Sequence, residues 1–207
     1  MKITPIKTPL VVKKMFPDFV WDIPTQNKVL YLTFDDGPTP ETTNWTLDIL
    51  KQYNAKATFF CVGDNVKKHP DLYQLIIDEN HKIGNHTQNH LKGWSTKTKA
   101  YLKNIKDAST YINSNLFRPP YGQIKPKQGK QLIDLGYHII MWDVLSFDWD
   151  QNVSKEQCFN NVISKAKNGS IIVFHDSLKA SINMKYTLPK ILEYYSEKGF
   201  TFKTLSL

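Results

Sequence analysis

Short apolar runs alternate with longer helix-like patterns along most of the chain. Seven of the runs have the length and content of buried strands, at 28–34, 56–62, 81–86, 116–118, 137–144, 170–175 and 200–206. Helical patterns fall between them, at 40–53, 70–80, 96–113, 126–135, 154–167 and 185–198. Mostly apolar strands that alternate with helices are typical of a parallel sheet covered on both faces. The alternation predicts an α/β fold, either a small barrel or an open doubly wound sheet.

The length of the chain is enough for one such fold. Its 207 residues are 41% hydrophobic, which supplies a single sizeable core. We expect one domain over residues 26–207, with residues 1–25 packing across it as an N-terminal strap. The cysteines, Cys61 and Cys158, form neither a disulfide framework nor a CxxC metal motif.

The charge of the chain is strongly basic, with a net charge of +8. This fits either a solvated lysine-rich surface or an anionic partner such as nucleic acid. The lysines are spread along the chain and not clustered in blocks, which favours the surface and argues against nucleic acid. No apolar run reaches the roughly 18 residues of a membrane span, and residues 1–19 lack the apolar stretch of a signal peptide. As written, the sequence predicts a cytoplasmic monomer without a transmembrane segment.

Polar residues gather where the predicted strands end. They are Asp35 and Asp36 after the first strand, His86 and His90 after the third, Arg118 at the end of the fourth, Asp148 and Trp149 after the fifth, His175 at the end of the sixth and Asp176 directly after it. The carboxyl ends of parallel strands share one face of a βα fold, and active sites lie on that face. We therefore expect these side chains to meet.

Two histidines in this set have a spacing that suits a metal. His86 and His90 are four residues apart, which places both rings on one side of a helical turn. With a carboxylate from a neighbouring strand end they form a common catalytic set for Zn²⁺. Fe(II) oxygenases use the same donor types, but those sites need neither a second carboxylate nor an arginine to orient it. Taken singly, Asp35–Asp36 also fits a turn cap, and His175 fits a core histidine.

Arginine is almost absent from the chain. Of the 27 Lys and Arg residues, only Arg118 is an arginine. Because the surface charge is made from lysine, position 118 is expected to need a planar fork of donors that holds a carboxylate in a fixed orientation.

Five short segments occur in a characteristic order, "TFDDGP", "HTQNH", "RPPYG", "SFDW" and "VFH". Together they resemble the five motifs of the NodB-type polysaccharide deacetylases, carbohydrate esterase family four, and the resemblance covers roughly residues 28–207. It implies a distorted seven-stranded (β/α) barrel with its active site at the C-terminal ends of the parallel strands. It also implies a catalytic domain that removes acetyl groups from N-acetylated glycans with one divalent metal, most simply Zn²⁺, with Co²⁺ or other ions as alternatives.

The resemblance assigns a role to each residue of the set. The metal would be bound by Asp36, His86 and His90. The base for metal-activated water would be Asp35, held by a bidentate pair with Arg118, and the acid that protonates the leaving amine would be His175, oriented by Asp148. The Tyr121 N–H would stabilise the oxyanion, and the substrate would contact Tyr121, Trp149 and Val173. Two positions depart from the family pattern, since Leu145 stands where the family usually has Asp and Val173 where it often has Leu.

The implied substrate is a glycan that contains N-acetylglucosamine, of the chitin-oligomer or peptidoglycan type. One alternative is an O-acetyl esterase that acts on a xylan-like polysaccharide with the same site. Another is a non-catalytic glycan-binding module, which would lack Asp35 or His175, and both are present. The family usually acts outside the cytoplasm, in contrast to the cytoplasmic location predicted above.

Overall fold

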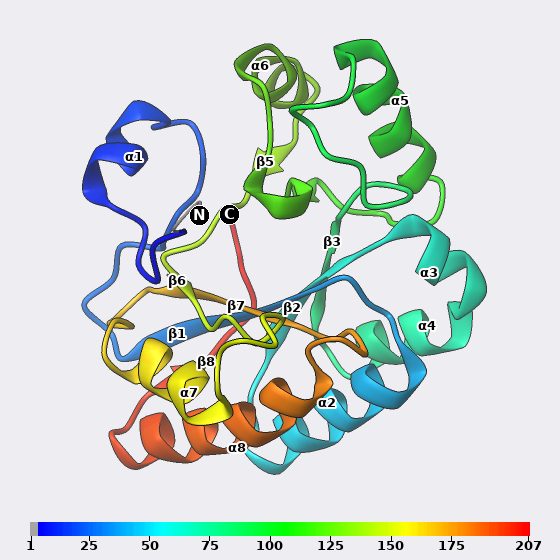
Figure 1. Ribbon diagram of the computed structural model, residues 1–207. Helices are drawn as coiled ribbons and strands as arrows, with labels where there is room; N and C mark the ends of the chain where they lie inside the picture. The colour runs from blue at the N-terminus through cyan, green and yellow to red at the C-terminus, as the bar shows by residue number, and fades with distance from the viewer. Residues whose placement is uncertain (1–3) are drawn as a thin grey trace.

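A computed structural model describes residues 4–207 and contains one parallel sheet (Figure 1). Its strands are β1 (Val29–Asp35), β2 (Ala57–Cys61), β3 (Lys82–Asn85), β4 (Leu116–Phe117), β5 (His138–Ile139), β6 (Val144–Leu145), β7 (Ile171–His175) and β8 (Thr201–Phe202). They lie in the order β5-β4-β3-β2-β1-β7-β6, and β8 pairs with the start of β1. The sheet curls into a half-barrel with helices outside it, which confirms the predicted α/β fold and favours the barrel over the flat doubly wound sheet.

Helices fill the connections between the strands. They are α1 (Leu10–Met15), α2 (Pro40–Gln52), α3 (Gly63–Lys68), α4 (Pro70–Asp78), α5 (Thr98–Ala108), α6 (Pro126–Asp134), α7 (Lys155–Ile163) and α8 (Ser181–Glu197). Proline occupies the first position of α2, α4 and α6, where its fixed φ suits a helix start. All predicted helices are present, whereas α1 and α3 were not predicted. Within residues 4–207, no helix has the length and apolar character needed to cross a bilayer.

The alternation of side chains along β1 explains how a buried strand ends in a carboxylate. Leu30, Leu32 and Phe34 pack in the main core. Because successive strand residues face opposite sides, Tyr31, Thr33 and Asp35 face the interior of the half-barrel. Asp35 is the last of these inward positions and therefore lies at the open, C-terminal end of the sheet.

The prediction of one continuous strand over 137–144 is wrong, because the structure has two short strands there, β5 and β6. Between them the backbone has other partners. The Arg118 side chain donates to the carbonyls of Ile140 and Met141, at 3.2 and 2.8 Å. A strand that turns its carbonyls toward a guanidinium cannot continue its ladder, so the sheet opens at this point.

The N-terminal segment lies across this opening. The Val20 N–H donates to Ile139 O at 2.9 Å, and the Met141 N–H donates to Val20 O at 2.7 Å. Further along, the Leu145 N–H donates to Ile6 O at 2.9 Å. The segment therefore supplies backbone partners to both β5 and β6 where the half-barrel lacks a neighbouring strand.

Candidate active site

A cleft of about 610 Å³ opens at the C-terminal ends of the strands. Eight of the ten residues predicted for the site line it: Asp35, Asp36, His86, His90, Tyr121, Trp149, Val173 and His175. The other two, Arg118 and Asp148, lie behind the wall and are 0% and 1% exposed. The structure thus gathers the predicted strand-end residues at one end of the sheet, together with Tyr121 and Val173, which only the resemblance had assigned to the site.

Asp36, His86 and His90 form a compact group of possible metal ligands. Their ligand atoms all lie within 4.8 Å of one another. Asp36 Oδ1 lies 3.1 Å from His90 Nε2 and 3.8 Å from His86 Nε2, and this buried oxygen accepts no hydrogen bond with acceptable geometry from residues 4–207. His86 Nδ1 lies 2.8 Å from the Arg118 carbonyl, which leaves Nε2 for the group. A buried acceptor without a hydrogen bond, beside two imidazoles, fits a Zn²⁺-type ion.

The ionisation states in this group also suit a metal. Burial lowers the pKa of His86 to about 4, so its imidazole is neutral at physiological pH. Burial raises the pKa of Asp36, but the His90 ring, 3.1 Å from its Oδ1, and the positive charge of His175 outweigh burial and hold the pKa below its usual range. A neutral imidazole and an ionised carboxylate are the forms that bind metals.

The turn that carries the two histidines is not helical, contrary to the prediction from their spacing. Thr87 and His90 have φ values of 67° and 59°, in the left-handed region. The reason is local, because the side chain of Asn85 accepts the Thr87 N–H at 2.8 Å and the Thr87 hydroxyl accepts the Leu91 N–H at 3.1 Å. The rings of His86 and His90 still lie close, with centroids 5.0 Å apart.

Arg118 holds Asp35, but not by the predicted bidentate pair. Nη1 donates to Asp35 Oδ1 at 2.7 Å and also to Thr33 Oγ1 at 2.7 Å. Nε donates to the Ile140 carbonyl and Nη2 to the Met141 carbonyl. The guanidinium is therefore spread over four acceptors, which fix its plane and leave only one nitrogen for the carboxylate. Lysine has no planar fork with which to reproduce these contacts.

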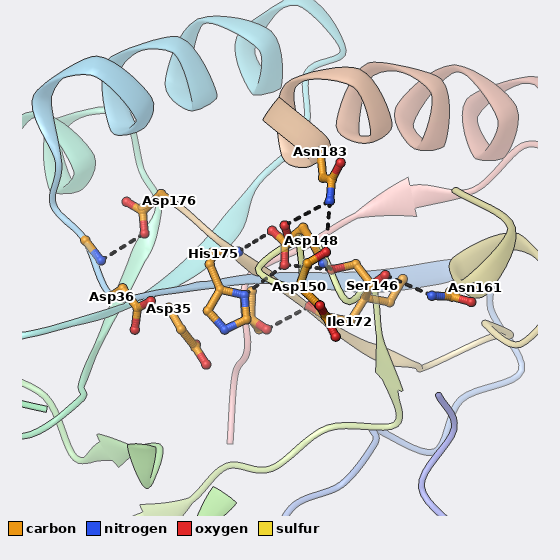
Figure 2. A network of polar contacts seen from close by, with 12 residues as sticks. Asp35, Asp36, Ser146, Asp148, Asp150, Asn161, Ile172, His175, Asp176 and Asn183 are labelled. Atoms are coloured by element: carbon orange, nitrogen blue, oxygen red, sulfur yellow. Dashed lines mark hydrogen bonds and ion pairs between the residues drawn. The ribbon is translucent and has the colours of Figure 1, made fainter. Parts of the chain in front are cut away.

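His175 is held by Asp148 on the other side of the cleft (Figure 2). Its Nδ1 lies 2.9 Å from Asp148 Oδ1, and its backbone N–H donates to Asp148 Oδ2 at 2.7 Å. Burial lowers the pKa of His175, but the charge and hydrogen bond of Asp148, with the charges of Asp36 and Asp35, raise it overall to about 9. His175 is also the register partner of Asp35 across β1 and β7. A protonated imidazole and a carboxylate thus stand on neighbouring strand ends.

The predicted substrate contacts line the rest of the cleft. Tyr121 has a φ of 60° and is 56% exposed. The Trp149 ring lies 4.7 Å from the His175 ring, centroid to centroid. Val173 pairs in register with Leu145, and both line the cleft. Leu145 therefore gives this wall an apolar surface at the position where the family usually has a carboxylate.

Two residues were missed as parts of the site. Asp176 was placed at the right strand end but given no role; it is 1% exposed, and burial raises its pKa to about 7. Its position directly after His175 was the available signal. Asn183 of α8 donates to the carbonyls of Asp148, Asp150 and Val153 at 3.0 to 3.4 Å. No local pattern marks Asn183, because its partners are brought to it only by the fold.

The family of the chain follows from comparison with known sequences. The sequence profile described as polysaccharide deacetylase matches residues 22–140, more than half of the chain. The chain belongs to the polysaccharide deacetylase family. Polysaccharide deacetylases of carbohydrate esterase family four are hydrolases. This agrees with the five sequence motifs and with the cleft that residues of these motifs line.

Similar deacetylases extend the comparison over nearly the whole chain. It is 34% identical over 197 residues to a peptidoglycan-N-acetylglucosamine deacetylase from Bacillus cereus, with 90% of both chains covered. It superposes on the crystal structure of the Bc1960 peptidoglycan N-acetylglucosamine deacetylase with a TM-score of 0.88 and 33% identity, covering 96% of this chain and 95% of that one. It is also 34% identical to the peptidoglycan-N-acetylmuramic acid deacetylase PdaC from Bacillus subtilis, over 86% of this chain but only 38% of PdaC.

Proposed function

We propose that this deacetylase removes the N-acetyl group from N-acetylglucosamine residues of a glycan of the peptidoglycan or chitin type, with the help of a divalent metal. The observation that carries the proposal is the pairing of Asp35 with His175 across neighbouring strand ends, beside the Asp36, His86 and His90 group. The named activities of the similar deacetylases from Bacillus support the choice of sugar and polymer.

The metal would be held by Asp36, His86 and His90, with Zn²⁺ or Co²⁺ as the simplest candidates. Such an ion acts as a Lewis acid and makes water a competent nucleophile near neutral pH. Asp35 lies next in the chain to one of these ligands, and Arg118 fixes its carboxylate at 2.7 Å. Asp35 would take the proton from the attacking water, a task that its defined orientation favours.

On the opposite wall of the cleft, His175 and Asp148 would assist departure of the leaving amine. An amide anion is too unstable to depart, so the nitrogen must receive a proton as the bond to the acetyl carbon breaks. His175 keeps its proton at neutral pH because its pKa is raised to about 9, and Asp148 occupies Nδ1 and so leaves Nε2 for the substrate. His175 would be the acid, and Asp148 would orient it.

The remaining lining residues would hold the acetyl group. The Tyr121 N–H would donate to the oxygen that becomes negative in the tetrahedral intermediate. Trp149 and Val173 would enclose the methyl group with apolar surface, and Leu145 would extend that surface.

The test is acetate release from N-acetylglucosamine oligomers and from peptidoglycan by wild type and His175→Ala, with 4-nitrophenyl acetate as a second substrate. Loss of the acid should reduce kcat/KM on the amides by roughly 10²–10⁴-fold. The activated ester should suffer far less, because its leaving group needs no proton. Equal losses on both substrates would remove His175 as the acid, and no acetate from any N-acetylated glycan with metal-loaded wild type would refute the proposed function.

A further inference from the structure

The turn after β1 holds Asp36 in a conformation that side chains rarely adopt. Its φ is 82°, and such a backbone persists only where surrounding contacts fix it. Two contacts hold the carbonyls of the turn: Asn65 Nδ2 on α3 donates to Asp36 O at 2.7 Å, and the N–H of Val62, directly after β2, donates to Gly37 O at 2.9 Å. The Gly37 N–H, a buried donor in the same turn, needs an acceptor of its own.

Asp176 supplies that acceptor from the end of β7. Its Oδ1 accepts the Gly37 N–H at 3.0 Å (Figure 2), and its Oδ2 accepts the hydroxyl of Thr43 on α2 at 2.5 Å. Its own backbone N–H donates to Asp35 O at 3.1 Å. One buried side chain thus joins the turn after β1 to the start of α2 and to the end of β7.

The fit between Asp176 and the turn is close. A Cβ at position 37 would lie 2.0 Å from Asp176 Oδ2, so only glycine lets the carboxylate reach the backbone. In the part of the chain that the structure describes, the hydrogen-bond donors to this carboxylate are an amide and a hydroxyl, both uncharged. Burying a carboxyl group without a cation partner is costly, so a contribution to folding stability alone does not explain why Asp176 lies here.

We propose that Asp176 is the positioning residue for Asp36. By fixing the Gly37 N–H against α2, it keeps the Asp36 carboxylate directed at the two histidines and thereby sets the affinity for the metal. This inference rests on the proposed function, in which Asp36 is a metal ligand. Groups that orient metal ligands typically change metal affinity by ~10–100-fold, and we expect an effect of that size.

Two threonines on α2 make a matched pair for the test. Thr43 and Thr46 are both fully buried. The Thr46 hydroxyl donates to Thr42 O within the helix at 2.8 Å, whereas the Thr43 hydroxyl contacts Asp176 and also accepts the Thr39 N–H at 2.8 Å. Valine at either position exchanges one buried hydroxyl for a methyl group, but only Thr43→Val loosens Asp176. Thr43→Ser keeps the hydroxyl and should rescue the effect.

The measurement is the dissociation constant for Zn²⁺, from competition with a chromophoric chelator, together with the Tm of each metal-free protein. We expect Thr43→Val to bind Zn²⁺ at least ~10-fold more weakly than Thr46→Val, although both lose a buried hydroxyl, and Thr43→Ser to bind as wild type does. Asp176→Ala, if it folds, should be weaker still. Equal affinities for the two valine variants would overturn the inference and leave the proposed function standing. A wild type that binds no Zn²⁺ would instead overturn the metal-dependent function on which the inference rests.

Discussion

Asp35 and Asp36 are neighbours in the chain but lie in different electrostatic surroundings. The Asp35 carboxylate accepts a hydrogen bond from the buried Arg118 guanidinium, and the Asp36 carboxylate faces His86 and His90. Because Asp36 has a left-handed φ, its side chain and that of Asp35 can point to different partners although the two residues are consecutive. Two adjacent anions are therefore tolerated, because each has its own cationic or metal-binding neighbourhood.

The first prediction separates the two carboxylates by mutation. Asp36→Ala should weaken metal binding, because it removes one of the three proposed ligands. Asp35→Asn should keep the metal and lower turnover by roughly 10²–10⁴-fold, because it removes the proposed base while preserving the shape of the side chain. Metal content and kcat/KM measured on the same preparations check this. An empty site in Asp35→Asn together with a loaded, inactive Asp36→Ala would show that the roles are reversed.

The second prediction concerns the pH dependence that follows from His175 as the proposed proton donor. His175 has a pKa raised to about 9 despite its burial, chiefly by Asp148. An acid works only while protonated, so activity should fall as pH rises through that pKa. Asp148→Asn removes the charge that raises the pKa, so the alkaline limb of kcat/KM should move to lower pH.

A nearby carboxylate provides the control for this profile. Asp150 lies two residues beyond Asp148 and accepts hydrogen bonds from Asn152, not from His175. Asp150→Asn should therefore leave the alkaline limb in place. A limb that does not move in Asp148→Asn either would assign the proton donor to another group.

At the level of elements, partly buried ion pairs hold the N-terminal segment against the half-barrel. Asp143, which lies between β5 and β6, is fully buried and pairs with Lys7 at 2.7 Å and Lys13 at 2.6 Å. It also accepts the Ser170 hydroxyl at 2.6 Å. Burial raises the pKa of Asp143, but hydrogen bonds from Lys13, Lys7 and Ser170 outweigh burial and lower it below 3.8.

The third prediction is that Lys13→Met destabilises the protein by about 1.5–3 kcal/mol, the contribution of a hydrogen bond to a charged group. Lys14→Met changes the exposed neighbour and should stay within roughly 0.5 kcal/mol of wild type. Because the folded pKa of Asp143 is lowered, its ion pairs contribute stability above its ordinary pKa and lose it as pH falls through the folded value. At pH 7 the denaturant midpoint of Lys13→Met should therefore lie below that of wild type, and the difference should shrink as pH falls below 3.8 and through the lowered folded pKa of Asp143. A difference that persists in acid would show a packing effect.

The strands were predictable from local sequence, whereas two features of the chain depend on contacts between residues that the fold brings together. Each predicted strand has a counterpart in the sheet, although 137–144 is divided into β5 and β6. Apolar runs between helical patterns are a strong signal, and parallel topology then brings the candidate site residues to one face. The break between β5 and β6 was not predictable, because it depends on Arg118 reaching the carbonyls of Ile140 and Met141 from another strand. The turn of His86 and His90 was also missed, since spacing alone does not reveal the Asn85 cap.

For the molecule as a whole, the candidate metal site joins distant parts of the chain. Asp36 follows β1, whereas His86 and His90 follow β3, and β2 separates these strands in the sheet. An ion bound to all three would hold together elements that the unfolded chain cannot keep in register. Metal binding should therefore be linked to folding of the entire domain.

The last prediction is that Zn²⁺ raises the Tm of the protein and that chelation lowers it. At a free metal concentration about 100 times the dissociation constant, binding contributes about 2.7 kcal/mol. For a chain of this length that corresponds to a shift of roughly 5–10 °C. The measurement is thermal unfolding with and without chelator, alongside elemental analysis that should give about one metal per chain. His90→Ala should abolish the shift, and His138→Ala, which changes an exposed histidine on β5, should retain it. Full acetate release from verified metal-free protein, with no change of Tm on adding Zn²⁺, would refute a metal site that serves both folding and catalysis.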